Sequence, residues 1–417
     1  MKLLLQRFYR YFKPLQPVPD ELQQNFKHLY FDIGWYAVLA GTSLAFLSIY
    51  ATRIGGTGTQ IGLISAGPAV VNLLFTLPAG MMLDRFKLNK AVFWSSVANR
   101  IFYSTWIFLP LFVPANTSIW IIVATTLVMN IPGTVLSVGF TVFFGEAVPI
   151  EWRGMVAGIR NAAYSLVTMI TTLIAGQILV HLPIRTGYAI VFAVGFLGSV
   201  MSSYHLKFVK PVQTPAREDT PTIPQELVKP QRRLKWYVLK GVYGRAIGLL
   251  VFFHLFQFLP LPVFPLYTVN ILKFTDQTIS IGAVLFALTQ FIISINLDRL
   301  IRKRNNLQIM GTGIVLMGAY PFLLAFSHAP LAYYGLSLVG GSAAGLVGGV
   351  LPNYLLEKMG PEDKPAHMVW YNLGLNAAVL VGSLLGPALA EGIGFIPALI
   401  IAAVGRSLAG VIILRRG

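Results

Sequence analysis

Apolar runs of about twenty residues recur along nearly the whole chain, each followed by a short polar connection. A helix of that length crosses about 30 Å of hydrocarbon, so each run predicts one transmembrane helix. We expect twelve such helices, at residues 28–53, 58–83, 91–113, 117–145, 153–180, 187–207, 245–270, 277–297, 307–327, 330–355, 366–390 and 394–414. No space for a soluble domain remains between them.

A polar, proline-rich stretch after residue 207 divides these helices into two sets of six. Because proline lacks the backbone N–H that a helix needs, this stretch cannot form a spanning helix. The prolines are Pro211, Pro215, Pro221, Pro224 and Pro230. We therefore predict a cytoplasmic amphipathic arm at 1–27, a six-helix bundle at 28–207, a cytoplasmic linker at 208–244 and a second six-helix bundle at 245–417.

Composition and charge place the chain in a membrane. Hydrophobic residues make up 55% and charged residues 11% of the sequence, whereas a soluble domain carries about 25% charged residues. The net charge of +17 would suggest nucleic acid in a soluble protein. Here most of the 32 Lys and Arg fall in the connections on one side, and the other side holds Arg53, Arg185 and Lys273. This skew predicts a multi-pass inner (plasma) membrane protein with both termini cytoplasmic and no nucleic-acid partner.

The two sets of helices repeat one another. Residues of the same type recur in order at equivalent topological places, and the offset between them shrinks slowly along the chain. The pairs are Tyr50 with Tyr267, Gln60 with Gln277, Asp84 with Asp298, Glu146 with Glu357 and Asn161 with Asn372. This pattern indicates duplication of one six-helix unit, a plan in which the solute path lies between the halves near the middle of the bilayer.

Several short motifs resemble those of the major facilitator superfamily. The loop after the second predicted helix reads Gly80-Met81-Met82-Leu83-Asp84-Arg85, with Lys87 where the family usually has Gly. The other motifs are Pro149 with Arg153-Gly154 and Gly158, and Gly382-x-x-x-Gly386-Pro387, with Ala390 in place of the last Gly. The resemblance implies an all-α membrane protein with twelve transmembrane helices in two pseudo-symmetric six-helix bundles, and it implies secondary transport. The glycine–proline pair that antiporters of the family carry in the fifth helix is absent.

Charged residues in the cytoplasmic loops are candidates for a conformational latch. A carboxylate at a helix end can accept bonds from a neighbouring helix N-terminus or an Arg, and such partners separate when the bundles rock. The candidate latch residues are Asp84, Arg85, Asp298, Arg299 and Arg153. The resemblance implies that Asp84 latches the inward-closed side against the eleventh helix. The alternative is that these residues are solvated loop charges.

Asp32 and Arg100 are ionisable residues inside the first six predicted helices, as is Arg160 in the fifth, and a charge at such a position is costly. Arg100 is near the middle of the third helix and either contacts an anionic solute or bridges structurally to a carboxylate or to carbonyls. Asp32 lies in the first helix and either carries a coupling proton or pairs with a base such as His28 or Arg160. Both alternatives stay open for each residue.

Neutral polar residues at membrane depth are candidates for the solute cavity. The first, fourth, seventh and tenth helices line the central path in the family, which selects Asn130, Thr134, His254 and Gln257, together with Arg100. His254 is also a candidate proton carrier. For each of these residues, the alternative is a structural hydrogen bond between helices.

The sequence favours a secondary active transporter that moves a small organic solute by alternating access, with proton coupling as a further hypothesis. It has no metal-binding helix, no phosphate loop and no cluster of acids with metal-ligand spacing, so we expect no cofactor, no metal and no enzymatic activity. We expect a monomer in a lipid bilayer, with a neutral or anionic solute as partner. The alternatives are a transporter-like receptor or scaffold without vectorial transport and, less favoured, an intramembrane enzyme.

Overall fold

The predicted membrane helices are present in the structure. A computed structural model describes residues 18–83, 85–212, 235–297, 300, 304–359 and 364–416. Within these ranges, eleven helices are long and apolar enough to cross a membrane. The third crossing completes the twelve and consists of two consecutive shorter helices, α5 (Leu88–Arg100) and α6 (Tyr103–Phe112).

The first half contains six crossings. The first begins at Asp20, eight residues before the predicted start, and contains one wider helical turn. The crossings of this half, besides α5 and α6, are α2 (Asp20–Leu39) with η1 (Ala40–Leu44) and α3 (Ala45–Arg53), α4 (Gly58–Leu83), α7 (Ala115–Ala147), α8 (Ile150–His181) and α9 (Ile184–Leu206). At the α5–α6 break, Ser104 and Thr105 donate to the carbonyls of Ile101 and Phe102, and these side-chain bonds stabilise the interruption.

The second half repeats this arrangement. A short helical turn, η3 (Trp236–Leu239), precedes its first crossing. The crossings are α10 (Val242–Phe258) with α11 (Val263–Leu266) and η4 (Tyr267–Ile271), α12 (Asp276–Ile295), α14 (Asn306–Ala325), α15 (Pro330–Lys358), α16 (Lys364–Ile393) and α17 (Phe395–Arg416). The exact limits of the cytoplasmic arm and linker stay predictions, because residues 1–17 and 213–234 lie outside the described ranges.

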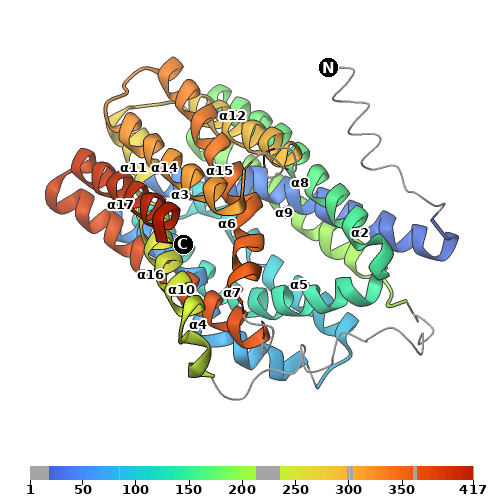
Figure 1. The fold of residues 1–417 in the computed structure, drawn as a ribbon. Coiled ribbons are helices and arrows are strands. Elements are labelled where there is room, and N and C mark those ends of the chain that lie inside the picture. The colour runs from blue at the N-terminus through green and yellow to red at the C-terminus, as the bar shows by residue number, and fades with distance from the viewer. Residues whose placement is uncertain are drawn as a thin grey trace, which may run out of the picture.

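The helix contacts show the expected pseudo-twofold relation. Within the first half, α4 packs on α7 and α2 packs on α8 and α9; in the second half, α12 packs on α15 and α10 packs on α16 and α17. Between the halves, α4 packs on α16 and α8 packs on α12, which exchange under the same relation. Figure 1 shows α8 and α12 side by side. The duplication read from the sequence is therefore reproduced in the packing.

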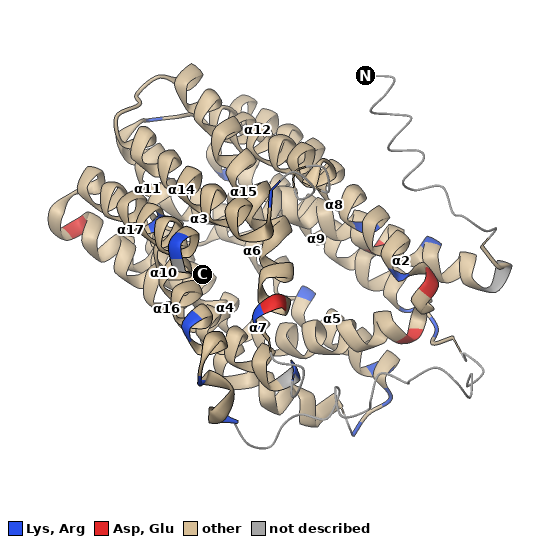
Figure 2. Cartoon of the chain, viewed as in Figure 1, with Lys and Arg blue, Asp and Glu red and all other residues tan. Residues whose placement is uncertain are grey.

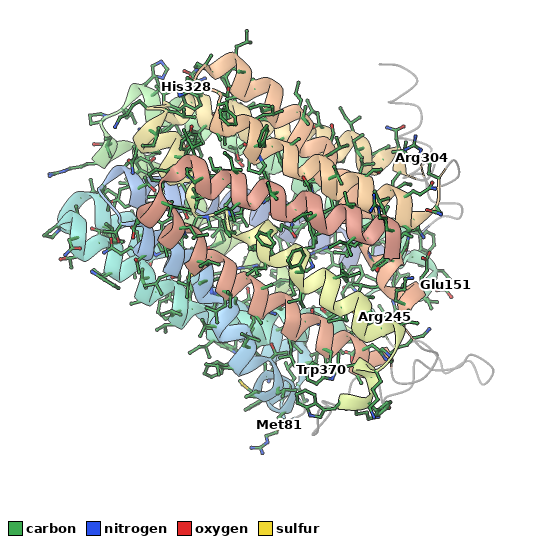
Figure 3. All side chains as sticks on the ribbon, turned by 60° about the vertical axis from the view of Figure 1, so that its left-hand side comes forward. Met81, Glu151, Arg245, Arg304, His328 and Trp370 are labelled. Atoms are coloured by element: carbon green, nitrogen blue, oxygen red, sulfur yellow. The ribbon has the colours of Figure 1, made fainter. Side chains whose placement is uncertain are left out.

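The two ends of the molecule differ in chemistry. Figure 3 places His328 at one end, which we call the outer end after the predicted orientation. Met81, Glu151, Arg245, Arg304 and Trp370 lie toward the opposite end, which we call the inner end. Figure 2 shows that long stretches of helix between the ends carry neither Lys and Arg nor Asp and Glu. This distribution suits a protein whose middle lies in hydrocarbon.

The hydrophobic core joins the two halves at the outer end. One cluster of buried side chains combines residues of both halves, among them Tyr50 and Tyr267, which the sequence repeat pairs. Toward the inner end each half has a cluster of its own, one around Phe143 and one around Tyr354. Buried side chains therefore join the two halves at the outer end, whereas toward the inner end each half has a buried cluster of its own.

Candidate functional site

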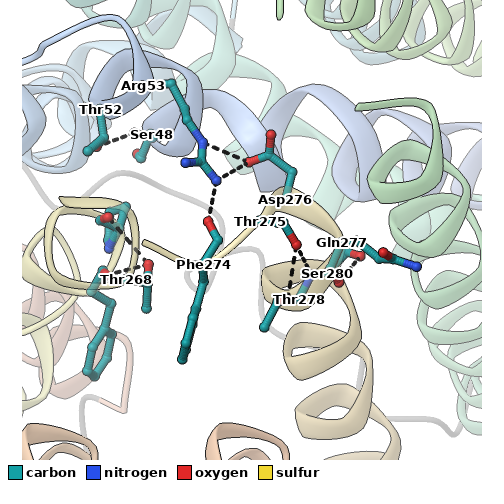
Figure 4. Close-up of polar contacts among 12 residues, drawn as sticks. Ser48, Thr52, Arg53, Thr268, Phe274, Thr275, Asp276, Gln277, Thr278 and Ser280 are labelled. Atoms are coloured by element: carbon teal, nitrogen blue, oxygen red, sulfur yellow. Dashed lines mark hydrogen bonds and ion pairs between the residues drawn. The ribbon is translucent and has the colours of Figure 1, made fainter. Parts of the chain in front are cut away.

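An ion pair connects the halves at the outer end. Arg53 is the last residue of α3, and Asp276 is the first residue of α12. Nε and Nη2 of Arg53 each donate to Oδ1 of Asp276 at 3.2 Å, and Nη2 also donates to the carbonyl of Phe274 at 2.5 Å. Figure 4 shows the guanidinium inserted between these acceptors. These bonds are charge-assisted, and they connect the last residue of α3 to the loop and first residue of α12 at the outer end.

A second contact closes the same end. The carboxylate of Glu391, near the end of α16, accepts a hydrogen bond from the backbone N–H of Gly58 at 2.8 Å. Gly58 is the first residue of α4, where the helix dipole favours a negative charge. The first half therefore offers a cation and a helix N-terminus, and the second half offers two carboxylates.

Neutral amides join the halves farther inward. Asn72 of α4 donates to Oδ1 of Asn376 of α16 at 3.3 Å, and Thr134 of α7 donates to Oδ1 of Asn72 at 2.9 Å. The single hydroxyl hydrogen of Thr134 is shared between Asn72 and the carbonyl of Asn130, and the side-chain amide of Asn130 donates to the carbonyl of Thr126. We call Asn72, Asn130, Thr134 and Asn376 the amide set. Among the described residues, every hydrogen bond between the halves lies at the amide set or on its outer side.

His254 and Gln257 form a separate polar group in the second half. Nδ1 of His254 lies 2.8 Å from Oε1 of Gln257, and Nε2 lies 3.3 Å from the hydroxyl of Tyr371 on α16. Because the amide oxygen only accepts, Nδ1 carries the ring proton and Nε2 accepts from Tyr371. This arrangement satisfies a buried neutral imidazole and links α10 to α16.

Asp32, Arg100 and Arg160 form a buried charge cluster in the first half. Both Nη atoms of Arg160 lie 3.2 Å from Oδ2 of Asp32, and Nη2 of Arg100 lies 3.8 Å from Oδ1. Ser202 donates to Asp32, and Arg100 donates to Ser203. Asp32 therefore pairs with Arg160, one of the two partners that the sequence suggested, and also with Arg100. No hydrogen bond among the described residues joins Arg100 to the amide set.

Arg406 in α17 is buried without a carboxylate partner among the described residues. Nε, Nη1 and Nη2 donate to the carbonyls of Phe256, Met317 and Gln257 at 3.0, 3.1 and 2.7 Å. Four residues after Phe256 and Met317 stand Pro260 and Pro321, which have no N–H to offer those carbonyls. Arg406 thus satisfies backbone acceptors that two prolines leave free.

The latch candidates are only partly within the described residues. Asp84, Asp298 and Arg299 lie outside them, and the side chain of Arg85 is exposed. Arg153 donates to the carbonyls of Val148 and Gly145 at 3.0 and 2.6 Å. In this conformation Arg153 caps the carboxyl end of α7, and the latch function stays a prediction.

The sequence reasoning missed the outer closure and half of the amide set. Asp276 and Glu391 are the acids on the outer side of the predicted topology, which could have marked them as partners for Arg53 or a helix N-terminus. Asn72 is an isolated amide in an otherwise apolar run of α4, and that isolation was a usable signal. Tyr371 gave no such signal, since aromatic residues are frequent throughout the chain. Within the described ranges, no group of three His, Asp or Glu residues could hold a metal ion.

Known proteins share this architecture. The sequence profile of the Major Facilitator Superfamily matches residues 33–261 and 247–416. The crystal structure of the nucleoside transporter NupG superposes with a TM-score of 0.65 at 13% identity, covering 94% of this chain and 99% of that one. A D-xylose-proton symporter gives 0.70 at 14% identity, with 94% and 96% covered.

The human organic anion transporter MFSD10 (TETRAN) gives a TM-score of 0.63 at 14% identity, with 95% and 100% of the two chains covered. No curated protein matches the chain by sequence. These structural likenesses concern the fold, whereas the profile matches both halves and nearly the whole chain. The chain belongs to the major facilitator superfamily, whose members are membrane transporters rather than enzymes.

Proposed function

We propose that the protein is a secondary active transporter that moves a small organic solute by alternating access between its two halves. The observation that carries the proposal is the asymmetry of the contacts between the halves. The ion pair of Arg53 with Asp276, the bond from the N–H of Gly58 to Glu391 and the core shared by both halves all lie at the outer end. At the inner end, each half has its own core. This asymmetry is the one expected of an end state of a rocking cycle in which the outer end is closed and the inner end is the side that opens.

The contacts that close the outer end are of a kind that can separate. Arg53 keeps 19% of its side-chain surface exposed and Glu391 is exposed, so water can replace each partner when the end opens. The ion pair is partly buried, since the side chain of Asp276 is only 8% exposed, and its contribution is on the order of 1 kcal/mol. A few contacts of this size bias the equilibrium between two states without freezing it.

We further propose that His254 exchanges a coupling proton and that Asp32 does not. Asp32 contacts two guanidinium groups and a hydroxyl, so its protonation would leave two buried cations without a counter-ion. His254 presents one unprotonated nitrogen to the hydroxyl of Tyr371, and the two lie on different helices of the second half. His254→Gln should abolish stimulation of uptake by a pH gradient and preserve exchange of solute at equal pH.

A disulfide between the halves tests alternating access directly, because the chain has no cysteine of its own. A Cβ built at Gly58 lies 2.9 Å from Cβ of Pro387 on the other half, closer than the roughly 3.5–4.5 Å of a disulfide, so a small separation of α4 from α16 brings the two positions into range. We expect Gly58→Cys with Pro387→Cys to crosslink on oxidation, to lose counterflow of solute in proteoliposomes, and to recover it on reduction. A panel of nucleosides, sugars and organic acids supplies the solutes.

A matched control pair lies within the first half. A Cβ built at Gly195 lies 3.0 Å from Cβ of Ser43, so Gly195→Cys with Ser43→Cys forms a crosslink of similar geometry between α9 and η1. Oxidation of this pair should leave counterflow unchanged. Undiminished transport by the oxidised Gly58–Pro387 pair would refute the rocking mechanism. Binding of a solute with no counterflow in the reduced state would favour a receptor.

A further inference from the structure

We infer that the transported solute is uncharged and that the amide set holds it through hydrogen bonds from both halves. The inference rests on the proposed transport function and adds a chemical class of substrate to it. It depends on two independent observations. The first is the unused hydrogen-bonding capacity of the amide set. The second is that the described contacts of the deep charged residues Asp32, Arg100, Arg160 and Arg406 go to groups outside the amide set.

The amide set offers donors and acceptors from both halves at one place. An asparagine side chain has two N–H groups and two lone pairs on its oxygen. Asn72 uses one N–H on Asn376, and Asn376 uses one on the carbonyl of Asn372. In the contacts of the described residues, each amide keeps a second N–H available. Asn72, Asn130 and Asn376 are each only partly buried, so a solute can reach them.

Six crossings at or near the boundary between the halves have no Asp, Glu, Lys or Arg in their interiors. The fifth crossing, α8, also packs across the boundary and contains Arg160, which is bonded to Asp32. Asp, Glu, Lys and Arg are absent from residues 58–83, 115–145, 246–272, 277–297, 330–356 and 365–390. These ranges cover the second, fourth, seventh, eighth, tenth and eleventh crossings. A charged solute between them would lack a counter-ion, and an unpaired charge at membrane depth costs several kcal/mol.

The four charged side chains at membrane depth, Asp32, Arg100, Arg160 and Arg406, contact groups other than the amide set. Asp32, Arg100 and Arg160 bond one another and neighbouring groups inside the first half, and Arg100 is 5% exposed. Arg406 is 4% exposed and directs Nε and both Nη atoms at backbone carbonyls. None of these groups is presented to the amide set among the described contacts. The anionic alternative that Arg100 left open is therefore disfavoured.

The geometry of the carboxamide groups restricts the chemical class of the solute further. Each carboxamide places a donor and an acceptor side by side, which matches a group with its own adjacent donor and acceptor. Vicinal hydroxyls of a polyol and the edge of a nucleobase are such groups. The solute that fits is a neutral, hydrogen-bonding compound of the polyol or nucleoside type.

Pairs of solutes that differ only in charge test the inference. Uridine is compared with uridine 5′-monophosphate, and glucose and xylose are compared with glucose 6-phosphate and glucuronate, by counterflow in proteoliposomes. We expect at least one neutral compound and none of the charged ones to exchange. Exchange of a charged member, or of no neutral member, overturns the inference.

Side-chain variants connect the result to the amide set. Asn376→Ala, Asn72→Ala and Thr134→Val should each raise the half-saturation constant about tenfold, because each removes one buried hydrogen bond to the solute or to the residue that orients it. Thr141→Val is the matched control: Thr141 lies on the same helix, is exposed, and bonds only the carbonyl of Ser137 among the described contacts. An equal effect of Thr141→Val and Thr134→Val contradicts the assignment.

The two proposals can fail separately. If a charged solute exchanges and the oxidised Gly58–Pro387 crosslink stops that exchange, alternating access stands and the neutral class is wrong. If the oxidised crosslink leaves exchange intact, alternating access is wrong whatever the solute.

Discussion

Arg53 and Asp276 form an ion pair between the two halves at the ends of their respective helices, one closing α3 and the other opening α12. The carboxylate also lies at the N-terminus of its own helix, where the dipole favours its negative charge. The guanidinium additionally bonds the carbonyl of Phe274, so the contact is more than a pair of charges. Opening the outer end must break all of these bonds together.

Loss of the cation should shift the equilibrium away from outer closure. We expect Arg53→Gln to slow disulfide formation in the Gly58→Cys, Pro387→Cys background about fivefold, which corresponds to about 1 kcal/mol. The rate of crosslinking on addition of an oxidant measures the effect. Arg185→Gln, an exposed arginine at the same end, should leave the rate unchanged. An identical rate for Arg53→Gln and the parent would show that the ion pair does not stabilise the closed state.

Removal of Asp32 should be more damaging than removal of Asp32 together with one of its partners. Asp32→Asn leaves Arg100 and Arg160 buried without a counter-ion, and breaking a buried pair in this way costs about 3–5 kcal/mol. The double variant Asp32→Asn with Arg160→Met removes one of the stranded cations, so part of the stability returns. Thermal unfolding in detergent ranks the stability of the parent, the single variant and the double variant. Equal or greater loss in the double variant would argue that the cluster is not held by charge.

Long-range architecture could be predicted from the sequence because it depends on length and periodicity. Runs such as 58–83 and 330–355 need only be apolar over about twenty residues to specify a crossing. The paired positions Tyr50 and Tyr267 specified the pseudo-twofold relation, and both are buried in the core that joins the halves. The break at Ile101 was missed, since hydroxyls of two later residues stabilise it and hydropathy does not detect them.

The candidate site could be predicted only where a charge inside the membrane must find a partner of opposite charge. The pairing of Asp32 with Arg160 was an open alternative because both are costly in hydrocarbon and must find partners. The bond between Asn72 and Asn376 depends on how two helices of different halves meet, and no local pattern encodes that meeting. The contacts of Arg406 could not be predicted, because its acceptors are carbonyls of two other helices, Phe256 and Gln257 in α10 and Met317 in α14.

The glycines of α15 provide a test of packing between the eighth and tenth crossings. A Cβ built at Gly341 lies 2.0 Å from the carbonyl oxygen of Phe286 on α12, whereas one built at Gly348 meets nothing within 4 Å. We expect Gly341→Ala to destabilise the protein by about 1–3 kcal/mol through overpacking. Gly348→Ala should stabilise it by up to about 1 kcal/mol, because Ala is the better helix former. Thermal unfolding of both variants measures these changes in stability. If the two variants are destabilised to a similar extent, α15 does not approach α12 closely at Gly341.

The role of Arg406 can be tested through the prolines that create its acceptors. Arg406→Gln removes donors from carbonyls that have no helical N–H, so about 1–3 kcal/mol should be lost per unsatisfied group. Pro260→Ala supplies an N–H four residues after Phe256, and that carbonyl then no longer depends on Arg406. Arg406→Gln should therefore cost less in the Pro260→Ala background than in the parent.

The matched background for this double-mutant cycle is Pro78→Ala, which changes a proline in α4, a helix that is not among those packed on α17. There the cost of Arg406→Gln should equal its cost in the parent, because distant sites add. The measurement is the shift in thermal midpoint for each single and double variant. If Pro260→Ala and Pro78→Ala alter the cost of Arg406→Gln equally, the guanidinium does not act by satisfying the carbonyl that Pro260 leaves free. A smaller cost only with Pro260→Ala would establish that one arginine stabilises the proline break beside His254 and Gln257.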